Sequence, residues 1–406
     1  MPADHVHSPQ TLPPISGKIS KTIGYYAAFI AFGLATAALG PTLPGLARHT
    51  QVGLREISIL FTARSLGFLC GAFLGGRLYD KFPGHPVIAS VLFIMAAAAV
   101  VVPLTPFLWL LAAIVLILGA AEGMVEVGSN TLLVWVHRQN LGPFMNGLHF
   151  FFGVGALLSP IIIARAMLLT GDITWAYWVL AIVIVPIAAW ILWLPSPHIE
   201  GQSEDRRNEQ IPYLLVMLIS LLFLLYVGGE ISFGGWIYTY TISLGLTNEA
   251  MAAYLTSAFW GALTFGRLLA IPISSRLKPQ TMLWVDFVGC VASIGIILWG
   301  GKSLLAVWVG TLGIGLSMAS VFPTLLAFAE RRIQISGKIN GWFFTGSGIG
   351  GMTLPWLIGQ LFESFGPAAA MVTILLDVIV GIVIFAIVVV YSHSYCSHNS
   401  RSKLRY

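Results

Sequence analysis

The chain has 406 residues, of which 57% are hydrophobic and 9% are charged. A soluble domain usually carries about 25% charged residues, so this composition excludes a soluble protein and leaves no room for a large soluble domain. The net charge of +5 comes from basic residues that lie mostly in the connections between apolar segments, which gives a nucleic-acid partner little support.

The first 20 residues are polar, and they lack the charged, apolar and small-residue order of a cleaved signal peptide. We expect a short disordered tail there. Twelve apolar segments follow, and most are long enough to cross about 30 Å of hydrocarbon. The sequence therefore predicts an all-α membrane protein with twelve transmembrane helices. The segments are residues 22–44, 56–78, 86–105, 108–133, 144–168, 174–194, 212–235, 250–271, 280–299, 304–327, 342–362 and 368–391.

The distribution of Lys and Arg predicts the topology. With both termini in the cytoplasm, fifteen of these residues fall on the cytoplasmic side and four on the outer side, as the positive-inside rule requires. The short loops and compact tails favour a bacterial inner (cytoplasmic) membrane. Arg64 and Arg267 remain inside spans, where pairing with an acid is a better explanation than contact with a substrate.

One long polar connection divides the segments six and six, and the halves resemble each other. Asn146 and Pro160 recur as Asn340 and Pro355, at an offset near 194 residues. Duplicated halves with a central site are a common transporter plan, in which one half rocks against the other. We therefore predict a disordered cytoplasmic tail, a first bundle, a cytoplasmic linker, a second bundle and a cytoplasmic tail, at residues 1–20, 21–194, 195–211, 212–391 and 392–406.

Two glutamates lie one helical turn apart inside the fourth segment. A carboxylate at mid-bilayer depth is costly and usually faces a water-filled path. Glu122, Glu126 and Asn130 share one helix face, which indicates a transport pathway. Glu126 and Asn130 could hold sugar hydroxyl groups, and a desolvated Glu126 could carry a proton. Glu122 and Glu126 could instead ligate Na⁺, or the pair could be structural and bonded to another helix.

The seventh segment contains a second intramembrane acid, Glu230, among four glycines that loosen the helix. Trp236 follows, and its ring could stack on a sugar or simply pack. Tyr238 and Tyr240 fit an aromatic belt at the membrane interface better than a substrate site. Glu230 and Trp236 are therefore the candidates for the wall opposite Glu126.

Further candidates for substrate contact are Asn146, His149, Asn340 and Gln360, with Trp342 a weaker one. His149 could titrate, bind substrate or pack. Asp286 lies near the start of its segment, where we expect a capping or interfacial role, and Asp377 has no assigned role. Three cysteines, Cys70, Cys290 and Cys396, show no metal or redox spacing.

The second segment ends in Gly76-Arg77-Leu78-Tyr79-Asp80-Lys81. This stretch resembles the signature loop between helices 2 and 3 of the major facilitator superfamily, although Pro83 and His85 depart from the family pattern. The resemblance implies a two-bundle fold and a gating role for Gly76, Arg77, Asp80 and Lys81. The alternative is an ordinary charged loop.

Within that superfamily, residues 33–43, 130–133 and 148–156 resemble the sodium-dependent glucose transporter branch, which is related to the fucose–proton symporters. The symporters have a helix 4 glutamate four residues before an asparagine, which matches Glu126 and Asn130, so the resemblance implies proton coupling and sugar binding at Glu126. Glu230 also matches an acid of the glucose transporter branch. The essential helix 1 aspartate of the symporters has no counterpart here, since the sequence has no acid between Asp4 and Glu56.

The sequence predicts a secondary active transporter of a neutral, hexose-like sugar, coupled to Na⁺ or H⁺. A neutral substrate is favoured because the spans contain more acids than bases. We predict no enzymatic activity, no cofactor, a monomer, and membrane lipids as the surroundings. Two alternatives remain open: proton-coupled efflux of drugs or cationic metabolites, and flipping of a lipid-linked sugar.

Overall fold

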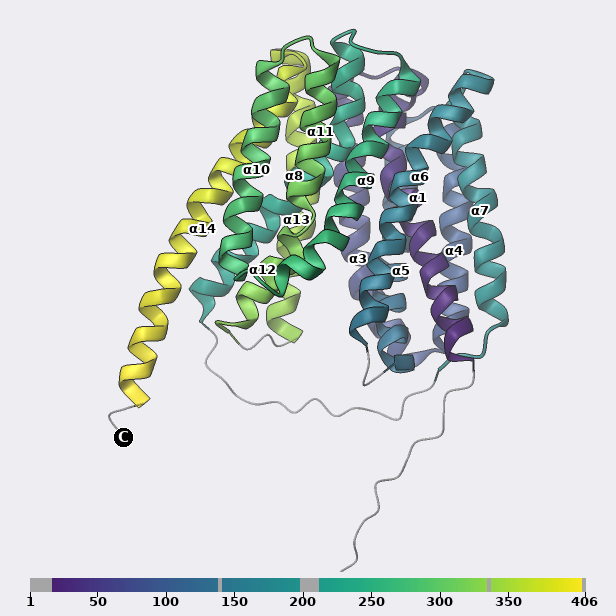
Figure 1. Ribbon diagram of the computed structural model, residues 1–406. Helices are drawn as coiled ribbons and strands as arrows, with labels where there is room; N and C mark the ends of the chain where they lie inside the picture. The colour runs from purple at the N-terminus through teal and green to yellow at the C-terminus, as the bar shows by residue number, and fades with distance from the viewer. Residues whose placement is uncertain (1–16, 138–140, 198–211, 334–336, 404–406) are drawn as a thin grey trace, which may run out of the picture.

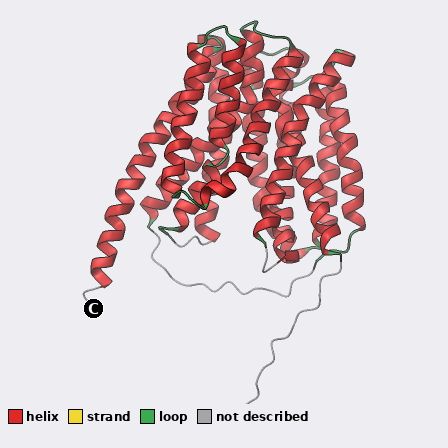
Figure 2. Cartoon of the chain, in the orientation of Figure 1, coloured by secondary structure: helices red, strands yellow, loops and turns green. Residues whose placement is uncertain are grey.

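The computed structural model describes residues 17–137, 141–197, 212–333 and 337–403, and within them every regular element is a helix (Figures 1 and 2). The elements, in chain order, are α1 (Lys18–Thr50), α2 (Leu54–Ile57), α3 (Ile59–Lys81), α4 (Gly84–Val101), the 3₁₀ turn η1 (Val102–Leu104), α5 (Leu108–His137), α6 (Gly142–Thr170), α7 (Ile173–Trp193), α8 (Tyr213–Ser243), α9 (Glu249–Ser274), α10 (Pro279–Trp299), α11 (Leu304–Met318), α12 (Val321–Glu330), α13 (Gly337–Phe365) and α14 (Ala368–Lys403).

The helices form because the segments are apolar over their whole length, and a bilayer requires every backbone polar group to be bonded within the segment. Ten helical rods in the described residues are long and apolar enough to cross a membrane, counting α2–α3 and α11–α12 as one rod each. The remaining two, α9 and α13, have 26 and 29 residues and are long enough to span as well. The predicted all-α fold with twelve long helices is confirmed.

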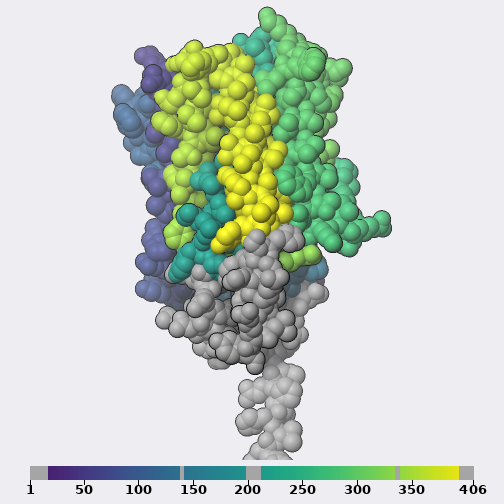
Figure 3. All heavy atoms as spheres, turned by 90° about the vertical axis from the view of Figure 1, so that its left-hand side faces the viewer, coloured from purple at the N-terminus to yellow at the C-terminus, as the bar shows by residue number. Residues whose placement is uncertain are grey.

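The helices gather into two groups, α1–α7 and α8–α14 (Figure 1). We call the interface between the groups the seam, the end that carries the start of α1 and the end of α14 the terminal side, and the opposite end the distal side. Figure 3 shows α14 lying on the outer surface of the second group. The exact bundle boundaries stay a prediction, because the predicted tail and linker fall largely on residues 1–16 and 198–211, outside the described residues.

Several helices are longer than the apolar segments that predicted them. α1 begins at Lys18 and continues to Thr50 through two prolines, α8 continues to Ser243, and α14 continues to Lys403. Prolines inside membrane helices are tolerated because neighbouring helices satisfy the freed carbonyls. The apolar segments at 22–44, 212–235 and 368–391 are therefore shorter than the helices that contain them, because hydropathy marks the apolar stretch and not the helix.

Glycines at the seam allow α1 to approach α8, and α6 to approach α9, more closely than larger residues would. A Cβ on Gly40 of α1 would lie 2.7 Å from the carbonyl oxygen of Gly234 and 2.9 Å from Cα of Gly235, both on α8. A Cβ on Gly153 of α6 would lie 2.1 Å from Oγ1 of Thr264 on α9. Small residues at helix crossings allow such close packing in membranes.

Polar contacts across the seam close the distal side. Arg48, near the end of α1, forms an ion pair of 3.2 Å with Glu249, the first residue of α9. Arg55 of α2 donates from Nε to Oε1 of Gln360 on α13 at 2.9 Å, and its backbone N–H donates to Glu363 at 3.3 Å. These contacts hold the two groups together at the distal side.

Candidate functional site

A buried ion pair ties three helices of the first group together. Nη2 of Arg64 on α3 lies 2.8 Å from Oε2 of Glu122 on α5 and donates a hydrogen bond of 2.8 Å to Oγ1 of Thr36 on α1. Glu122 is 0% exposed and Arg64 is 8% exposed. Since a lone charge at this depth is costly, each residue depends on the other for its place in the fold.

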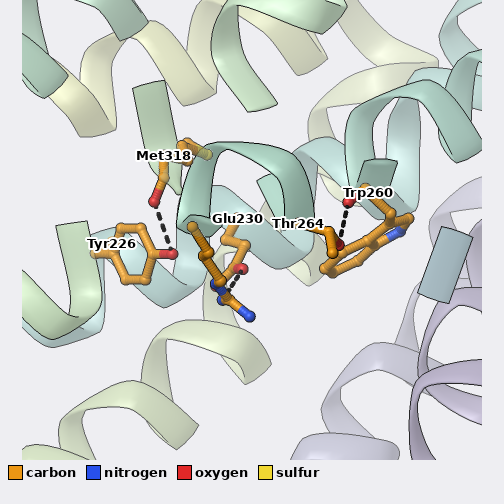
Figure 4. A network of polar contacts seen from close by, with 6 residues as sticks. Tyr226, Glu230, Trp260, Thr264 and Met318 are labelled. Atoms are coloured by element: carbon orange, nitrogen blue, oxygen red, sulfur yellow. Dashed lines mark hydrogen bonds and ion pairs between the residues drawn. The ribbon is translucent and has the colours of Figure 1, made fainter. Parts of the chain in front are cut away.

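A second ion pair lies in the other group. Nη2 of Arg267 on α9 lies 3.4 Å from Oε1 of Glu230 on α8. One turn earlier on α8, the hydroxyl of Tyr226 donates to the carbonyl oxygen of Met318 at 3.1 Å (Figure 4). Arg267 is partly exposed and acts electrostatically on His149 of α6, across the seam. Each intramembrane arginine therefore has an acidic partner from its own group.

A small cavity lies at the seam, between the two groups. Its lining comes from α1, α3, α8 and α9, and includes the guanidinium of Arg64 and the indole of Trp260. Two buried N–H donors of these residues, Arg64 Nε and Trp260 Nε1, have no hydrogen-bond partner within the described part of the chain. Buried donors are almost always paired, so these two N–H groups favour an oxygen acceptor. The cavity volume is about 10 Å³ in this conformation, room for at most one water molecule, so a larger ligand would require the two groups of helices to move apart. The lining residues are Thr36, Ala37, Gly40, Phe61, Arg64, Ile231, Gly234, Gly235 and Trp260.

The acidic face of α5 is present, but its three members differ in their contacts. Nδ2 of Asn130 donates to the backbone carbonyl of Glu126 at 2.9 Å, so the amide is used within its own helix. The carboxylate of Glu126 is partly exposed and has no side-chain bond or ion pair among the described residues. Glu126 is therefore the acid of this face that stays available for a cation or a substrate.

The guanidinium of Arg64 changes the interpretation of Glu122. A cation held jointly by Glu122 and Glu126 would have to sit beside a positive charge that is already 2.8 Å from the Glu122 carboxylate. A Na⁺ site at Glu122 and Glu126 would therefore require Arg64 to move away from Glu122, and this site stays a prediction. The structural alternative, an acid bonded to another helix, describes Glu122 better.

The aromatic residues of α8 lie inside the protein. Trp236 is fully buried, donates from Nε1 to the carbonyl of Pro355 at 3.0 Å and stacks on Phe362. Tyr238 and Tyr240 are also buried. The expected aromatic belt at the lipid interface is thus wrong for these tyrosines, because the helix continues to Ser243 and turns them into the bundle.

The other predicted contact residues do not converge on the seam cavity. Gln360 accepts from Arg55 and donates to the backbone carbonyl of Arg55, within the distal contact. Asn146 and His149 are exposed on the first turns of α6, and His149 contacts the ring of Phe29. Asn340 is partly exposed near the start of α13.

The predicted gate residues lie at the terminal end of α3. Arg77, Asp80 and Lys81 are exposed, and Arg77 lies over the ring of Phe73. A Cβ on Gly76 would meet nothing within 4 Å, so no helix packs against it here. Within the described residues Asp80 makes no ion pair, and the gating role of these residues stays a prediction.

The expectation for Asp286 was wrong. The N-cap of α10 is Lys278, and Asp286 lies two turns inside the helix, where it accepts a hydrogen bond from Ser320. Sequence reasoning also missed Thr36 and Trp260. Trp260 stands in Phe259-Trp260-Gly261, which reads as ordinary packing, and only the unpaired indole N–H distinguishes it.

Two groups of spanning helices with a polar cavity at their interface define an integral, multi-pass membrane transporter. The chain belongs to the Major Facilitator Superfamily, whose family model matches residues 25–355. It is a transporter and not an enzyme.

Curated relatives are similar over most of their length. The chain is 29% identical to the sodium-dependent glucose transporter 1A of Mus musculus, over 83% of this chain and 88% of the relative. It is 30% identical to the sodium-dependent glucose transporter 1 of Xenopus laevis, over 82% and 74%. It is 26% identical to the major facilitator superfamily domain-containing protein 4A of Homo sapiens, over 86% and 87%.

Solved structures share the fold. A D-xylose-proton symporter superposes with a TM-score of 0.71 at 13% identity, over 90% of this chain and 97% of the other. The nucleoside transporter NupG superposes with a TM-score of 0.69 at 14% identity, over 92% and 98%. At these identities the comparison shows the fold alone.

Proposed function

We propose that the chain carries a neutral, hexose-like sugar across the membrane by alternating access, driven by a Na⁺ or H⁺ gradient. The observation that carries this proposal is the seam cavity, where Arg64 Nε and Trp260 Nε1 lack acceptors. Sugar hydroxyl oxygens are acceptors for such donors, and an indole face packs on the C–H face of a pyranose. The names of the glucose transporter relatives support the same substrate class.

The charges around the seam favour a neutral substrate. Arg64 is already neutralised by Glu122, and Arg267 by Glu230. An anion would have to displace a buried carboxylate, and a cationic drug would meet the guanidinium of Arg64 in the cavity wall. The positive charge of Arg64 beside the cavity therefore weighs against efflux of cationic metabolites.

In alternating access, the distal side and the terminal side of the protein open in turn. The distal side is closed here by Arg48 with Glu249 and by Arg55 with Gln360. In our proposal these contacts open when the terminal side closes, and Gly76, Arg77, Asp80 and Lys81 then meet the other group. The terminal side is the cytoplasmic side of a bacterial inner membrane in this proposal, and the carrier works as a monomer.

The test is counterflow of radiolabelled glucose in proteoliposomes that contain the purified protein. Counterflow needs no ion gradient, so it tests the substrate class alone. We expect an overshoot that related hexoses compete away. If the folded protein gives no overshoot with any hexose in a panel, the sugar proposal is refuted. Proton-coupled efflux and flipping of a lipid-linked sugar would then be the leading candidate functions.

A matched pair of variants tests the cavity itself. Trp260→Phe keeps a ring and removes the unpaired N–H, so the apparent sugar affinity should fall by about tenfold, the worth of one hydrogen bond to a neutral partner. Trp236→Phe removes an indole N–H that donates to Pro355, outside the cavity lining, and serves as the control. Equal sugar affinity in both variants would place the substrate elsewhere.

A further inference from the structure

A second cavity lies inside the α8–α14 group, away from the seam cavity. It is enclosed by α8, α10, α11 with α12, and α14, and its walls are mostly apolar. One carboxylate, Asp377 of α14, lies among them. The cavity volume is about 20 Å³, room for one water molecule or one small ion. The remaining lining residues are Leu222, Leu225, Tyr226, Phe287, Cys290, Met318, Val321, Val378 and Gly381.

Asp377 is 7% exposed and has no hydrogen bond or ion pair within the described residues. Its carboxylate packs directly on the backbone of α8: a Cβ on Gly229 would lie 3.1 Å from Oδ2 of Asp377. Both arginines of the membrane interior are already paired with other acids. A buried carboxylate without a positive partner is costly, so Asp377 must be neutralised by something else.

The cavity also adjoins a break in a membrane helix. α11 ends at Met318 and α12 begins at Val321, and the Leu316 carbonyl accepts the Ala319 N–H at 3.4 Å in place of a regular α-helical bond. The carbonyl oxygen of Met318 accepts the Tyr226 hydroxyl, and Ser320, inside the break, donates to Asp286 of α10. The end of a helix carries a partial negative charge, and broken helices coordinate cations this way in transporters.

The groups that face Asp377 carry no positive charge. Tyr226 of α8, Cys290 of α10 and Met318 of α11 line the same cavity as Asp377. Asp286 adds a second carboxylate beside the break. The nearest guanidinium to Tyr226, Arg267, is paired with Glu230. Asp377 therefore lies in a cavity whose lining includes the end of α11, while Asp286 lies on the far side of the break.

We propose that Asp377, in the cavity beside the break between α11 and α12, binds a monovalent cation, either Na⁺ or a proton. The site is separate from the acidic face of α5. It is linked to the seam by one stretch of α8, because Gly229 touches Asp377 and the next residue, Glu230, pairs with Arg267. Occupancy of the site can therefore shift the Glu230–Arg267 pair through α8. This consequence rests on the proposed function, but the binding itself does not.

The experiment measures cation binding to the full-length protein without sugar. One arm follows binding of radioactive Na⁺ to purified parent, Asp377→Asn and the control Asp172→Asn, whose exposed carboxylate only caps α7. The other arm follows proton uptake across the neutral pH range in a weak buffer. Na⁺ binding that Asp377→Asn weakens by about tenfold or more identifies a sodium site. Proton uptake that is lost only in Asp377→Asn identifies a proton site.

A second pair of variants tests the site without removing any charged group, so that a loss of binding caused by misfolding of Asp377→Asn can be recognised. Gly229→Ala presses a methyl group onto the Asp377 carboxylate and should weaken cation binding several-fold. Gly295→Ala adds the same methyl group where nothing lies within 4 Å and should not. If Asp377→Asn and Gly229→Ala both match the parent in both arms, the site does not exist. A protein that fails glucose counterflow but binds cations at Asp377 would refute the sugar proposal alone.

Discussion

Glu126 differs from its neighbours on α5 in that its side chain makes no hydrogen bond or ion pair among the described residues. It shares a helix face with Glu122 and Asn130, yet Glu122 is held by Arg64 and the Asn130 amide by its own helix. Glu126 alone keeps a partly exposed carboxylate without a bond among the described residues. A group that must bind and release an ion during each cycle needs this kind of freedom.

The substitution Glu126→Gln should abolish accumulation of sugar driven by an ion gradient and spare counterflow. The amide keeps the shape and the hydrogen-bonding capacity, and it loses the ability to hold a proton or a cation. Uptake against a gradient and counterflow are compared in the same proteoliposomes. Accumulation equal to that of the parent would show that Glu126 does not couple the ion.

At the scale of single residues, the sequence predicted the cost of a charge in lipid but not its partner. An arginine inside a span requires an acid, and both arginines have one. The identities of the partners depend on which helices cross, and α3 meets α5 only in the folded bundle. Trp260 was overlooked for the same reason, since an indole without an acceptor becomes visible only when all its neighbours are placed.

At the scale of elements, the crossing of α1 over α8 depends on glycine. The contact joins Gly40 to the backbone of Gly234 and Gly235, and a backbone cannot move aside as a side chain can. The fit of the two groups at the seam therefore depends on the absence of a single methyl group.

The variant Gly40→Ala should lower the thermal stability of the purified protein. Overpacking a close contact costs about 1–3 kcal/mol, whereas alanine at an open helical site is normally favourable. Thermal unfolding is measured beside Gly295→Ala, which has open space around it. An equal or higher melting temperature for Gly40→Ala would show that α1 and α8 separate readily at this point.

The elements show what hydropathy can and cannot predict. Twelve spans followed from twelve apolar segments, because the bilayer requires length and apolarity. The ends of α1, α8 and α14 did not follow, since helices run on where bundle packing replaces lipid. The break at Ala319 and Ser320 was also missed, although the sequence carries a signal for it: Pro323 has no N–H to donate to the carbonyl of Ala319, four residues earlier.

At the scale of the whole molecule, the side-chain contacts that join the two groups at the distal side are exposed, and a further hydrogen bond of 3.2 Å runs from Thr62 of α3 to the carbonyl of Met352 on α13. Arg48 and Glu249 form one of these contacts, and both are exposed. Such a pair contributes about 0.2–1 kcal/mol, which can bias a two-state equilibrium without locking it. This strength suits a gate that must open in every cycle.

Tethering this gate should stop transport. A flexible, reducible crosslinker between Arg48→Cys and Glu249→Cys, with Cys70, Cys290 and Cys396 replaced, should abolish counterflow until a reductant is added. The two single-cysteine variants, treated alike, serve as controls. Full counterflow in the linked protein would mean that the distal side never needs to open, and alternating access would be wrong.

The two ion pairs have an electrical consequence. Arg64 pairs with Glu122 inside one group, and Arg267 pairs with Glu230 inside the other, so neither pair spans the interface between the groups. When the groups rock, these fixed charges travel with their counter-charges and displace almost no net charge through the membrane field. The transient charge movement of the rocking step is then left to bound ions and to acids without a partner among the described residues, such as Glu126.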